Sequence, residues 1–323
     1  MTNLPLRDTS GTSLGIIRRL ARSVLETRAF ASVRLFLFTR ELKSERERVR
    51  QAAEALRLPI FSRAVLEQLR ARKPDATTAF ILGTGASVAK LDSQDLAYIT
   101  SQFSVGVNQW ILHPMVPDVY AYEVDPDVRL LQMLDREDVK KADPTLLFLR
   151  PSIPSQFPHA QHIPKFLRDR TYIYGRSNIW TRKPKNIGPD SLSILKSPKI
   201  SNDVDILLDN GASIARMAAL CFLVGFQKIV LVGVDLNNVR YFWHENPQLI
   251  EPLGIKDYET GQKGNTHETL STTHRPFPID EFITGLAASA LFEGVDIFIG
   301  SEDSQLAGAL PVFMFRHPGT SAK

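Results

Sequence analysis

Short apolar runs alternate with segments of helical periodicity along most of the chain. The apolar runs are followed by turn residues and predict buried strands at Thr78–Leu82, Ser104–Val107, Asp118–Val124, Leu146–Leu149, Lys228–Val234 and Val295–Ile299. Helices are expected between them, at Ser93–Thr100, Val128–Leu134, Ser213–Val224 and Ile279–Glu293, with a left-handed cap at Gly225. This alternation predicts a Rossmann-like α/β fold, with a mostly parallel sheet and helices on both of its faces.

Two long segments interrupt this pattern. Residues 151–206 are rich in proline, polar residues and aromatic residues, and residues 236–277 are mostly polar. Both compositions are typical of irregular insertions, and loops of this kind often serve as lids or acceptor sites.

The part of the chain before the first strand is helical and basic. Apolar residues recur at helical spacing over residues 12–72, with arginines between them, Pro59 breaks the pattern, and Lys73–Asp75 has the composition of a linker. We therefore expect an N-terminal helical appendage over residues 1–75 and a Rossmann-like domain over residues 76–323. The basic amphipathic surface of the appendage either rests on a membrane or a partner helix, or is a solvated face of helices that pack on the main domain. The second interpretation is favoured because basic helices are common.

Composition limits the classes of function only weakly. The chain has 323 residues, of which 43% are hydrophobic and 23% charged, as in an ordinary globular protein. The net charge of +4 favours anionic partners such as nucleotides, phospholipid headgroups or acidic glycans. The single cysteine, Cys221, lies in an apolar helical run and is expected to be a buried, inert thiol. No apolar run approaches the roughly 20 residues that span a bilayer, and no signal peptide is recognisable, so we expect a cytoplasmic protein.

The turn after the first strand is the first candidate for chemistry. Gly83 and Gly85 would let the backbone approach a ligand, with exposed N–H groups for a phosphate or carboxylate, and Thr84 and Ser87 add hydroxyls. The turn matches neither a dinucleotide fingerprint nor a phosphate loop, so a purely structural turn is the alternative.

Polar residues follow the next two strands. Asn108 and Gln109 present amides that can bind a base or a sugar hydroxyl; the alternative is an Asn cap with Trp110 in the core. Glu123, Asp125 and Asp127 could hold a divalent metal that carries a nucleoside diphosphate, or could form a loop that binds hydroxyls.

The second half of the chain contributes a helix start, a strand end and a histidine. Asn210, Gly211 and Ser213 open a helix whose N–H groups suit a phosphate, and Asp235 ends a buried strand. A capped helix and a capped strand end are the alternative interpretation. His244, His267 and His274 match no compact zinc motif. His274 precedes the closing helix, where it could act as a general base.

Taken in order, these segments resemble two related groups of bacterial glycosyltransferases. One group comprises the sialyltransferases that decorate lipooligosaccharide from CMP-sialic acid, and the other the motility-accessory-factor-like enzymes. The resemblance covers residues 78–312 and rests on five segments, Leu82-Gly-Thr-Gly-Ala-Ser87, Asn108-Gln109, Pro117-Asp118 with Asp125-Pro126, Asn210–Ser213 through Gly225-Phe226 to Gly233-Val-Asp235, and His274.

The resemblance implies a Rossmann-like inverting transferase that takes its donor as a CMP-sugar and needs no metal or other cofactor. It implies that His274 deprotonates the acceptor hydroxyl, that the first turn and Asn108-Gln109 hold the nucleotide, and that Ser213 approaches the donor phosphate or carboxylate. Thr84 replaces the asparagine of these families. Asn237 stands where the sialyltransferases have a phosphate-binding tyrosine, which leaves Tyr241 or Tyr258 as substitutes.

The implied function is therefore transfer of an acidic keto-sugar, either sialic acid, a related nonulosonic acid or Kdo, to a surface glycan. The expected partners are the CMP-sugar and a glycan or lipid-linked acceptor, with peripheral contact to the inner membrane through the N-terminal helices. A homo-oligomer is compatible with the chain, and no nucleic acid is expected. The alternatives are a non-catalytic nucleotide- or glycan-binding protein and a metal-dependent transferase that uses a nucleoside-diphosphate sugar.

Overall fold

A single eight-stranded sheet forms the centre of the molecule. The computed structural model describes residues 31–123, 128–151, 154–179, 181, 183–237, 240–251, 268–272 and 276–315. Every strand pair is parallel, and the strand order is β6-β5-β4-β3-β2-β1-β7-β8. The strands are β1 (Thr78–Leu82), β2 (Phe103–Val107), β3 (Val119–Tyr122), β4 (Thr145–Leu149), β5 (Thr171–Asn178), β6 (Ile206–Asp209), β7 (Lys228–Val232) and β8 (Asp296–Ile299).

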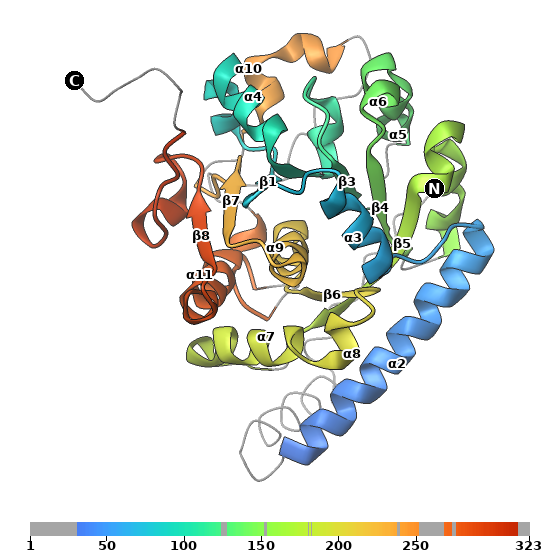
Figure 1. Ribbon diagram of the computed structural model, residues 1–323, viewed down its shortest axis with the longest axis vertical. Coiled ribbons are helices and arrows are strands. Elements are labelled where there is room, and N and C mark those ends of the chain that lie inside the picture. The colour runs from blue at the N-terminus through green and yellow to red at the C-terminus, as the bar shows by residue number, and fades with distance from the viewer. Residues whose placement is uncertain are drawn as a thin grey trace, which may run out of the picture.

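Helices cover both faces of this sheet (Figure 1). They are α2 (Ala31–Leu56), α3 (Arg63–Ala71), α4 (Ser93–Ser101), α5 (Arg129–Gln132), α6 (Glu137–Ala142), α7 (Ile187–Leu195), α8 (Pro198–Ser201), α9 (Ser213–Val224), α10 (Phe242–Glu245) and α11 (Ile279–Ala290). Successive strand residues point to opposite faces, so Ala79 and Ile81 join a core with α3, α7, α9 and α11, whereas Phe80 and Leu82 join a core with α4, α5, α6 and α10. The predicted Rossmann-like α/β fold is confirmed.

The predicted strands and helices agree with the structure, whereas two segments expected to be irregular differ in part. All six predicted strands and all four predicted helices are present with small shifts at their ends, and Gly225 has the expected left-handed conformation with φ +86°. The expectation that residues 151–206 are irregular is wrong, because β5, α7, α8 and β6 lie there. Pro154 and Pro158 lie in a 3-10 segment, Pro154–His162, and Pro164 is the N-cap of a second one, Lys165–Arg170; both segments precede β5. In β5 itself, polar residues alternate with buried ones and hide the strand pattern. In residues 236–277 the described part contains the short helix α10 and two 3-10 segments, and residues 238–239, 252–267 and 273–275 lie outside the described residues.

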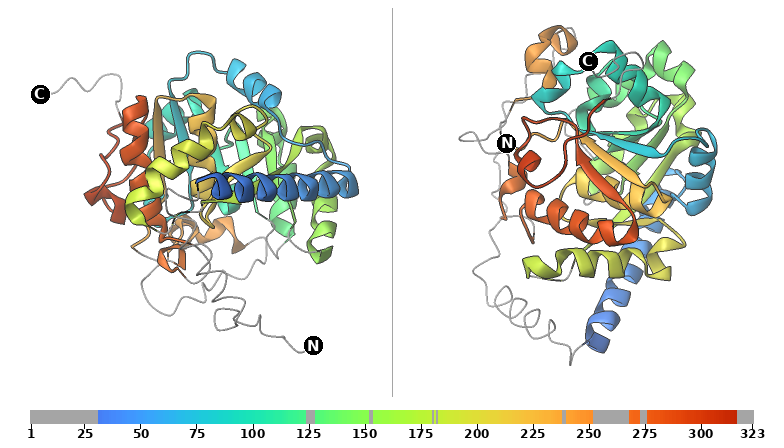
Figure 2. Two further views of the ribbon diagram at one scale, coloured as in Figure 1. Left: turned by 90° about the horizontal axis from the view of Figure 1, so that it is seen from below. Right: turned by 60° about the vertical axis from the view of Figure 1, so that its left-hand side comes forward.

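Helix α2 packs along the β5 side of the sheet (Figure 2). It is a single helix of 26 residues that ends before Pro59. Its residues Leu42 and Val49 are buried against the two cores. Arg46 pairs with Asp205 at 2.9 Å, which ties the helix to the residue before β6. The described part of the basic segment thus packs on the sheet, as the favoured interpretation expects, while the part before Ala31 lies outside the described residues. The domain division at residue 75 stays a prediction.

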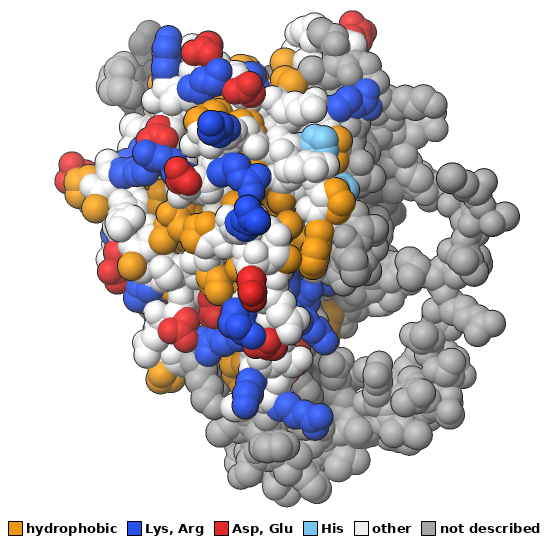
Figure 3. All heavy atoms as spheres, turned by 90° about the vertical axis from the view of Figure 1, so that its right-hand side faces the viewer, with side chains coloured by type: hydrophobic (Ala, Val, Ile, Leu, Met, Phe, Trp, Pro, Cys, Tyr) orange, Lys and Arg blue, Asp and Glu red, His pale blue; other side chains and the backbone are white. Residues whose placement is uncertain are grey.

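Three further features concern membrane-spanning helices, the surface around α2 and the single cysteine. Within the described ranges, no helix combines the length and the apolar character that crossing a membrane requires. The face on which α2 lies carries basic side chains, several of them beside acidic ones, with apolar side chains between them (Figure 3). Cys221 is fully buried in α9, as predicted, and burial raises the pKa of its thiol.

The strand order creates a point at which ligands commonly bind in such sheets. From β1 the chain proceeds to β2 and onward to β6, and α9 then returns it across the sheet to β7 on the other side of β1. The connections that leave β1 and β7 therefore run in opposite directions. In open parallel sheets, a crevice opens beyond the carboxyl ends of two strands with this relation.

Candidate functional site

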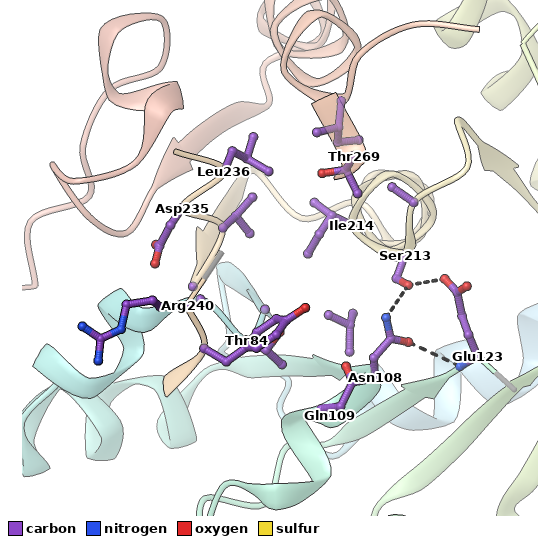
Figure 4. Close-up of a pocket in the computed structure, with 18 of the residues that line it drawn as sticks. Thr84, Asn108, Gln109, Glu123, Ser213, Ile214, Asp235, Leu236, Arg240 and Thr269 are labelled. Carbon is purple, nitrogen blue, oxygen red and sulfur yellow. Dashed lines mark hydrogen bonds between the residues drawn. The ribbon is translucent and has the colours of Figure 1, made fainter. Parts of the chain in front are cut away.

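A cavity of about 310 Å³ lies at this point, beyond the carboxyl ends of β1, β2, β3 and β7 and against the start of α9. Its volume is at the lower end of the range for small-molecule sites, which is roughly 300–1,000 Å³. The described residues around it include predicted donor-binding residues: Gly83, Thr84, Gly85, Asn108, Gln109, Gly211, Ser213, Asp235 and Tyr241. In Figure 4, Asp235 and Leu236 stand on one side of this hollow, and Ser213 and Glu123 stand on the other.

The two glycines of the β1 turn pack against the turn that follows β7. The N–H of Gly83 donates to the carbonyl of Val232 at 2.7 Å, and the N–H of Gly85 donates to the carbonyl of Gly233 at 2.8 Å. A Cβ at Gly83 would lie 2.6 Å from the Gly233 carbonyl oxygen. The expectation that these N–H groups face an anion is therefore wrong. Glycine is required because two backbone turns approach each other closely.

Asp235 holds the same two turns together from the other strand. Its carboxylate accepts the N–H of Ser87 at 2.9 Å, and the Ser87 hydroxyl donates to its second oxygen. Ser87 is 8% exposed, Asp235 is 4% exposed, and Ser87 does not line the cavity among the described residues. A Cβ at Gly85 would lie 2.5 Å from the Asp235 carboxylate. This arrangement fixes one wall of the cavity and leaves its ligand contacts to other residues.

Asn108 connects three separate segments at the opposite wall. Its amide nitrogen donates to the Ser213 hydroxyl at 3.0 Å, and its amide oxygen accepts the N–H of Glu123 at 3.4 Å. The Ser213 hydroxyl also donates to the Glu123 carboxylate. Asn108 adopts the left-handed region with φ +49°, which asparagine tolerates better than most residues. The carboxyl ends of β2 and β3 are thus joined to the start of α9, while Trp110 is fully buried beneath.

A buried arginine stands behind this wall. Arg216, in the first turns of α9, is 0% exposed and donates to Asp209 at 2.6 Å. Its other terminal nitrogen pairs with the Glu123 carboxylate. Burial lowers the pKa of Arg216 to about 9, which keeps it protonated at neutral pH, and burial raises the pKa of Asp209 to about 6. The sequence prediction missed Arg216, although a lone charged residue in an apolar helix is a signal of such a role.

The start of α9 presents backbone donors to the cavity. The segment from Gly211 to Ile214 lines it, and α9 has no side-chain cap. Asp209 accepts the N–H of Gly211 at 2.9 Å, but no acceptor among the described residues lies on the N–H groups of Ser213 and Ile214. The first N–H groups of a helix and its dipole favour an anion at this position. The start of α9 can therefore stabilise a phosphate or carboxylate in the cavity.

Tyr241 enters the cavity because its segment pairs with the β1 turn. Gly85 and Tyr241 form an antiparallel bridge, and the carbonyl of Thr84 accepts the N–H of Phe242 at 3.1 Å. The Tyr241 ring stacks on Trp243 with the ring centres 4.3 Å apart. His244 accepts the N–H of Tyr241 at 2.9 Å, which gives this histidine a role in capping α10.

Several predicted residues lie elsewhere. Asn210 is fully buried behind the cavity, where its amide donates to the carbonyl of Phe277 at 2.9 Å. Asn237 is exposed and donates to the carbonyl of Asp303. Neither lines the cavity among the described residues. Asp125 and His274 lie outside the described residues, so their predicted roles stay predictions.

Other lining residues were not predicted from the sequence. They are Val107, Ala212, Ile214, Gly233, Val234, Leu236, Arg240, Thr269 and Ile279, together with Glu123, which was considered only as a metal ligand or loop residue. Arg240 pairs with Glu245 at 2.8 Å, and its side chain leads away from the centre of the cavity in Figure 4. Across the described segments, no group of three His, Cys, Asp or Glu residues is arranged to hold a metal ion.

Comparisons with known proteins give one type of similarity. No protein-family model and no curated protein matches the sequence. Among solved structures, the chain is similar to the sialyltransferase CstII from Campylobacter jejuni in complex with a substrate analogue, CMP-3FNeuAc, with a TM-score of 0.39 and 12% identity over 73% of this chain and 86% of that chain. Two structures of the sialyltransferase Cst-II in complex with CMP have TM-scores of 0.38 and 12% identity, over 73% and 72% of this chain and 86% of theirs. We assign no residue role from these structures.

Proposed function

We propose that this chain is an inverting glycosyltransferase that binds a CMP-sugar in the cavity at the β1–β7 switch point and transfers an acidic keto-sugar to a glycan acceptor. One observation carries this proposal. Segments that carry the sequence resemblance, far apart along the chain, meet around a single cavity: Gly83–Gly85, Asn108-Gln109, Gly211–Ser213 and Asp235. Turns that served only local structure would not all need to border one cavity.

The polar groups that line the cavity suit a nucleoside monophosphate linked to an acidic sugar. We place the negatively charged part of the donor at the start of α9, where the N–H groups of Ser213 and Ile214 face the cavity. The amides of Asn108 and Gln109 are candidates for contacts with the cytosine or the ribose. Tyr241, and not Asn237, supplies a phenol at the cavity for the leaving phosphate.

A metal ion is not part of the proposal. CMP leaves with a single phosphate, so less charge has to be neutralised than with a nucleoside diphosphate. The Glu123 carboxylate is engaged by Arg216 and by the Ser213 hydroxyl, which is a role in positioning the α9 wall. Both partners contact Oε1 of Glu123, so a metal ion bound through this oxygen would compete with Arg216 and Ser213.

The proposed chemistry is a direct displacement. The acceptor hydroxyl oxygen attacks the anomeric carbon of the keto-sugar, the bond from that carbon to the phosphate oxygen breaks, and CMP leaves with the electron pair. The acceptor proton passes to His274, as the sequence resemblance implies, and attack from the face opposite CMP inverts the anomeric centre. Preorganised donors near the leaving phosphate stabilise the charge that develops on it.

Thermal shift with CMP, CDP, UDP and GDP, each with and without manganese, tests the donor nucleotide. The expected result is a shift with CMP alone that is independent of manganese. A shift that requires manganese and a diphosphate would instead indicate the metal-dependent alternative, and no shift with any nucleotide would refute nucleotide binding.

His274→Ala tests the base. Donor hydrolysis and transfer are expected to fall by about 10²–10⁴-fold while CMP binding is retained, because general base catalysis contributes about this factor. His162→Ala is the matched control, because His162 does not line the cavity among the described residues. Unchanged turnover in His274→Ala would remove this histidine from the mechanism. CMP binding by the unmodified chain without hydrolysis or transfer would indicate the non-catalytic alternative.

A further inference from the structure

A second cavity lies farther along the same edge of the sheet. Its volume is about 490 Å³, and it opens between α2 and the carboxyl ends of β4 and β5. Arg150 follows β4 directly, and Arg176 and Asn178 belong to the last residues of β5. Because the carboxyl ends of parallel strands are where α/β sheets place ligand-contacting groups, this position is suited to a site.

Arginines dominate the lining of this cavity. Four of them, Arg40, Arg48, Arg150 and Arg176, occur there with two glutamates, Glu41 and Glu45, which leaves an excess of two positive charges among these residues. Arginine guanidinium groups match the geometry of phosphate oxygens and can bind them through paired hydrogen bonds.

One of the two glutamates of this cavity, Glu45, is committed to structure. Glu45 is 4% exposed, and both of its oxygens accept from the Arg150 guanidinium, at 2.5 and 2.7 Å. It also accepts the backbone N–H of Arg176 at 3.1 Å. This pair fastens α2 to β4 and β5, and it removes both Glu45 and most of Arg150 from contact with a ligand.

The other arginines keep exposed guanidinium groups. The side chain of Arg48 is 59% exposed, although it lies 3.6 Å from Glu45, and that of Arg176 is 38% exposed. Arg40 is exposed on the same helix, two turns before Arg48. Three cations from two elements therefore border one hollow that an anion can enter.

The two cavities are connected by a chain of contacts. Arg176 lies 3.6 Å from Asp209, and Asp209 accepts from Arg216 at 2.6 Å. Arg216 in turn pairs with Glu123 at the wall of the first cavity. Both cavities therefore lie beyond the carboxyl ends of the strands, and Arg176, Asp209 and Arg216 connect the lining of one to the lining of the other.

We propose that the arginine-lined cavity between α2, β4 and β5 binds a phosphate group carried by the acceptor. The statement that the acceptor carries this phosphate rests on the proposed function, whereas the phosphate site itself does not. The phosphate belongs either to a soluble sugar phosphate or to the headgroup of a lipid-linked glycan. In both cases the same guanidinium groups, those of Arg40, Arg48 and Arg176, provide the recognition.

Calorimetric titration of the full chain with inorganic pyrophosphate tests the site. The double variant Arg40→Gln/Arg48→Gln removes two exposed guanidinium groups and leaves the Glu45–Arg150 pair intact. Lys43→Gln/Arg50→Gln is the matched control, because both residues are exposed on α2, are not among the residues of the cavity, and give the same change in charge. We expect at least a tenfold loss of pyrophosphate affinity in the first variant, which corresponds to about 1.4 kcal/mol, and little change in the control. Equal affinity in all three proteins, or an equal loss in the two variants, would overturn the site.

CMP titrations of the same proteins separate this inference from the proposed function. We expect the same CMP affinity in the unmodified chain and in both double variants, because Arg40 and Arg48 do not line the first cavity. If CMP fails to bind while pyrophosphate still depends on the two arginines, the donor proposal fails and the phosphate site stands. If CMP binds but pyrophosphate does not depend on them, the phosphate site fails alone.

Two further probes identify the source of the phosphate. Glucose 1-phosphate represents the soluble ester, and vesicles of phosphatidylcholine with phosphatidic acid represent the lipid headgroup. Loss of binding to either probe in Arg40→Gln/Arg48→Gln, with the control unchanged, supports the site and names the source. Binding to neither probe by the unmodified chain contradicts it.

Discussion

Replacing Arg216 with methionine tests how the wall of the first cavity is held. The substitution preserves much of the side-chain volume in α9 but removes the cation that contacts Asp209 at 2.6 Å and pairs with Glu123. Asp209 is 0% exposed, and among the residues that the structure describes the charged neighbour it would keep is Arg176, 3.6 Å away. Breaking a buried ion pair by removing one partner costs about 3–5 kcal/mol, so we expect a loss of this size in the free energy of unfolding at neutral pH.

The loss should depend on pH in a defined direction. Burial already raises the pKa of Asp209 to about 6, above the ordinary value of 3.8. Without Arg216 this pKa rises further, because a positive neighbour that favours the carboxylate is gone. A group whose pKa is higher in the folded state than in the unfolded state favours folding as pH falls. The variant should therefore recover part of its lost stability when the pH is lowered from about 7 to about 5.

Urea denaturation at the two pH values measures this effect, and a double-mutant cycle assigns it. Asp209→Asn keeps an acceptor for the N–H of Gly211 but removes the charge. In Arg216→Met/Asp209→Asn, the cost should therefore be smaller than the sum of the two single costs. Additive costs, or an Arg216→Met cost that is the same at both pH values, would refute the role of Asp209 as the stranded charge.

Two other substitutions test separate parts of the structure. Gly85→Ala places a methyl group 2.5 Å from the Asp235 carboxylate, so it should separate the β1 and β7 turns and weaken CMP binding about tenfold by calorimetry, whereas Gly308→Ala, with nothing within 4 Å, should not. His113 is 8% exposed, and burial together with the Arg136 charge lowers its pKa to about 4 from 6.5. The contribution of neutral His113 to the free energy of unfolding, roughly 3 kcal/mol, is present above pH 6.5 and is lost as the pH falls toward 4. His113→Asn retains an acceptor for the Met115 N–H and should flatten this decline in urea denaturation; an unchanged slope would contradict the assignment.

Burial on both faces makes a strand easy to predict from sequence, as β1 and β7 show, although the equally buried but short β6 was missed and the half-buried β8 was predicted. β1 and β7 are continuous apolar runs because their neighbours and the helices leave no side exposed, so period and length suffice to locate them. β5 is different, because alternate positions such as Arg176 and Asn178 are partly exposed toward the second cavity. A strand that supplies polar groups to a site loses the apolar pattern by which strands are recognised.

The same limit applies to the candidate site. The ends of the strands indicate which turns contribute to the site, and nine of the nineteen described lining residues were predicted on this basis. What each residue does depends on partners far away in the sequence. Gly85 is required because Asp235 and Gly233 lie against it, and Ser87 serves Asp235 and not a ligand. These contacts join residues separated by half of the chain, and no local pattern encodes them.

Asp209 illustrates why the two cavities should be considered together. Asp209 is the last residue of β6, which is the outermost strand of the sheet, and α9, which begins at Ser213, leads the chain back to the centre of the sheet. Its carboxylate accepts the N–H of Gly211, contacts Arg216 and lies near Arg176. The backbone donors of α9 and the guanidinium of Arg176 are thereby held on the same edge of the sheet by one buried anion. The proposed transferase would have to present donor and acceptor to each other at a fixed spacing, and a buried carboxylate that contacts residues of both cavities is a means of fixing it.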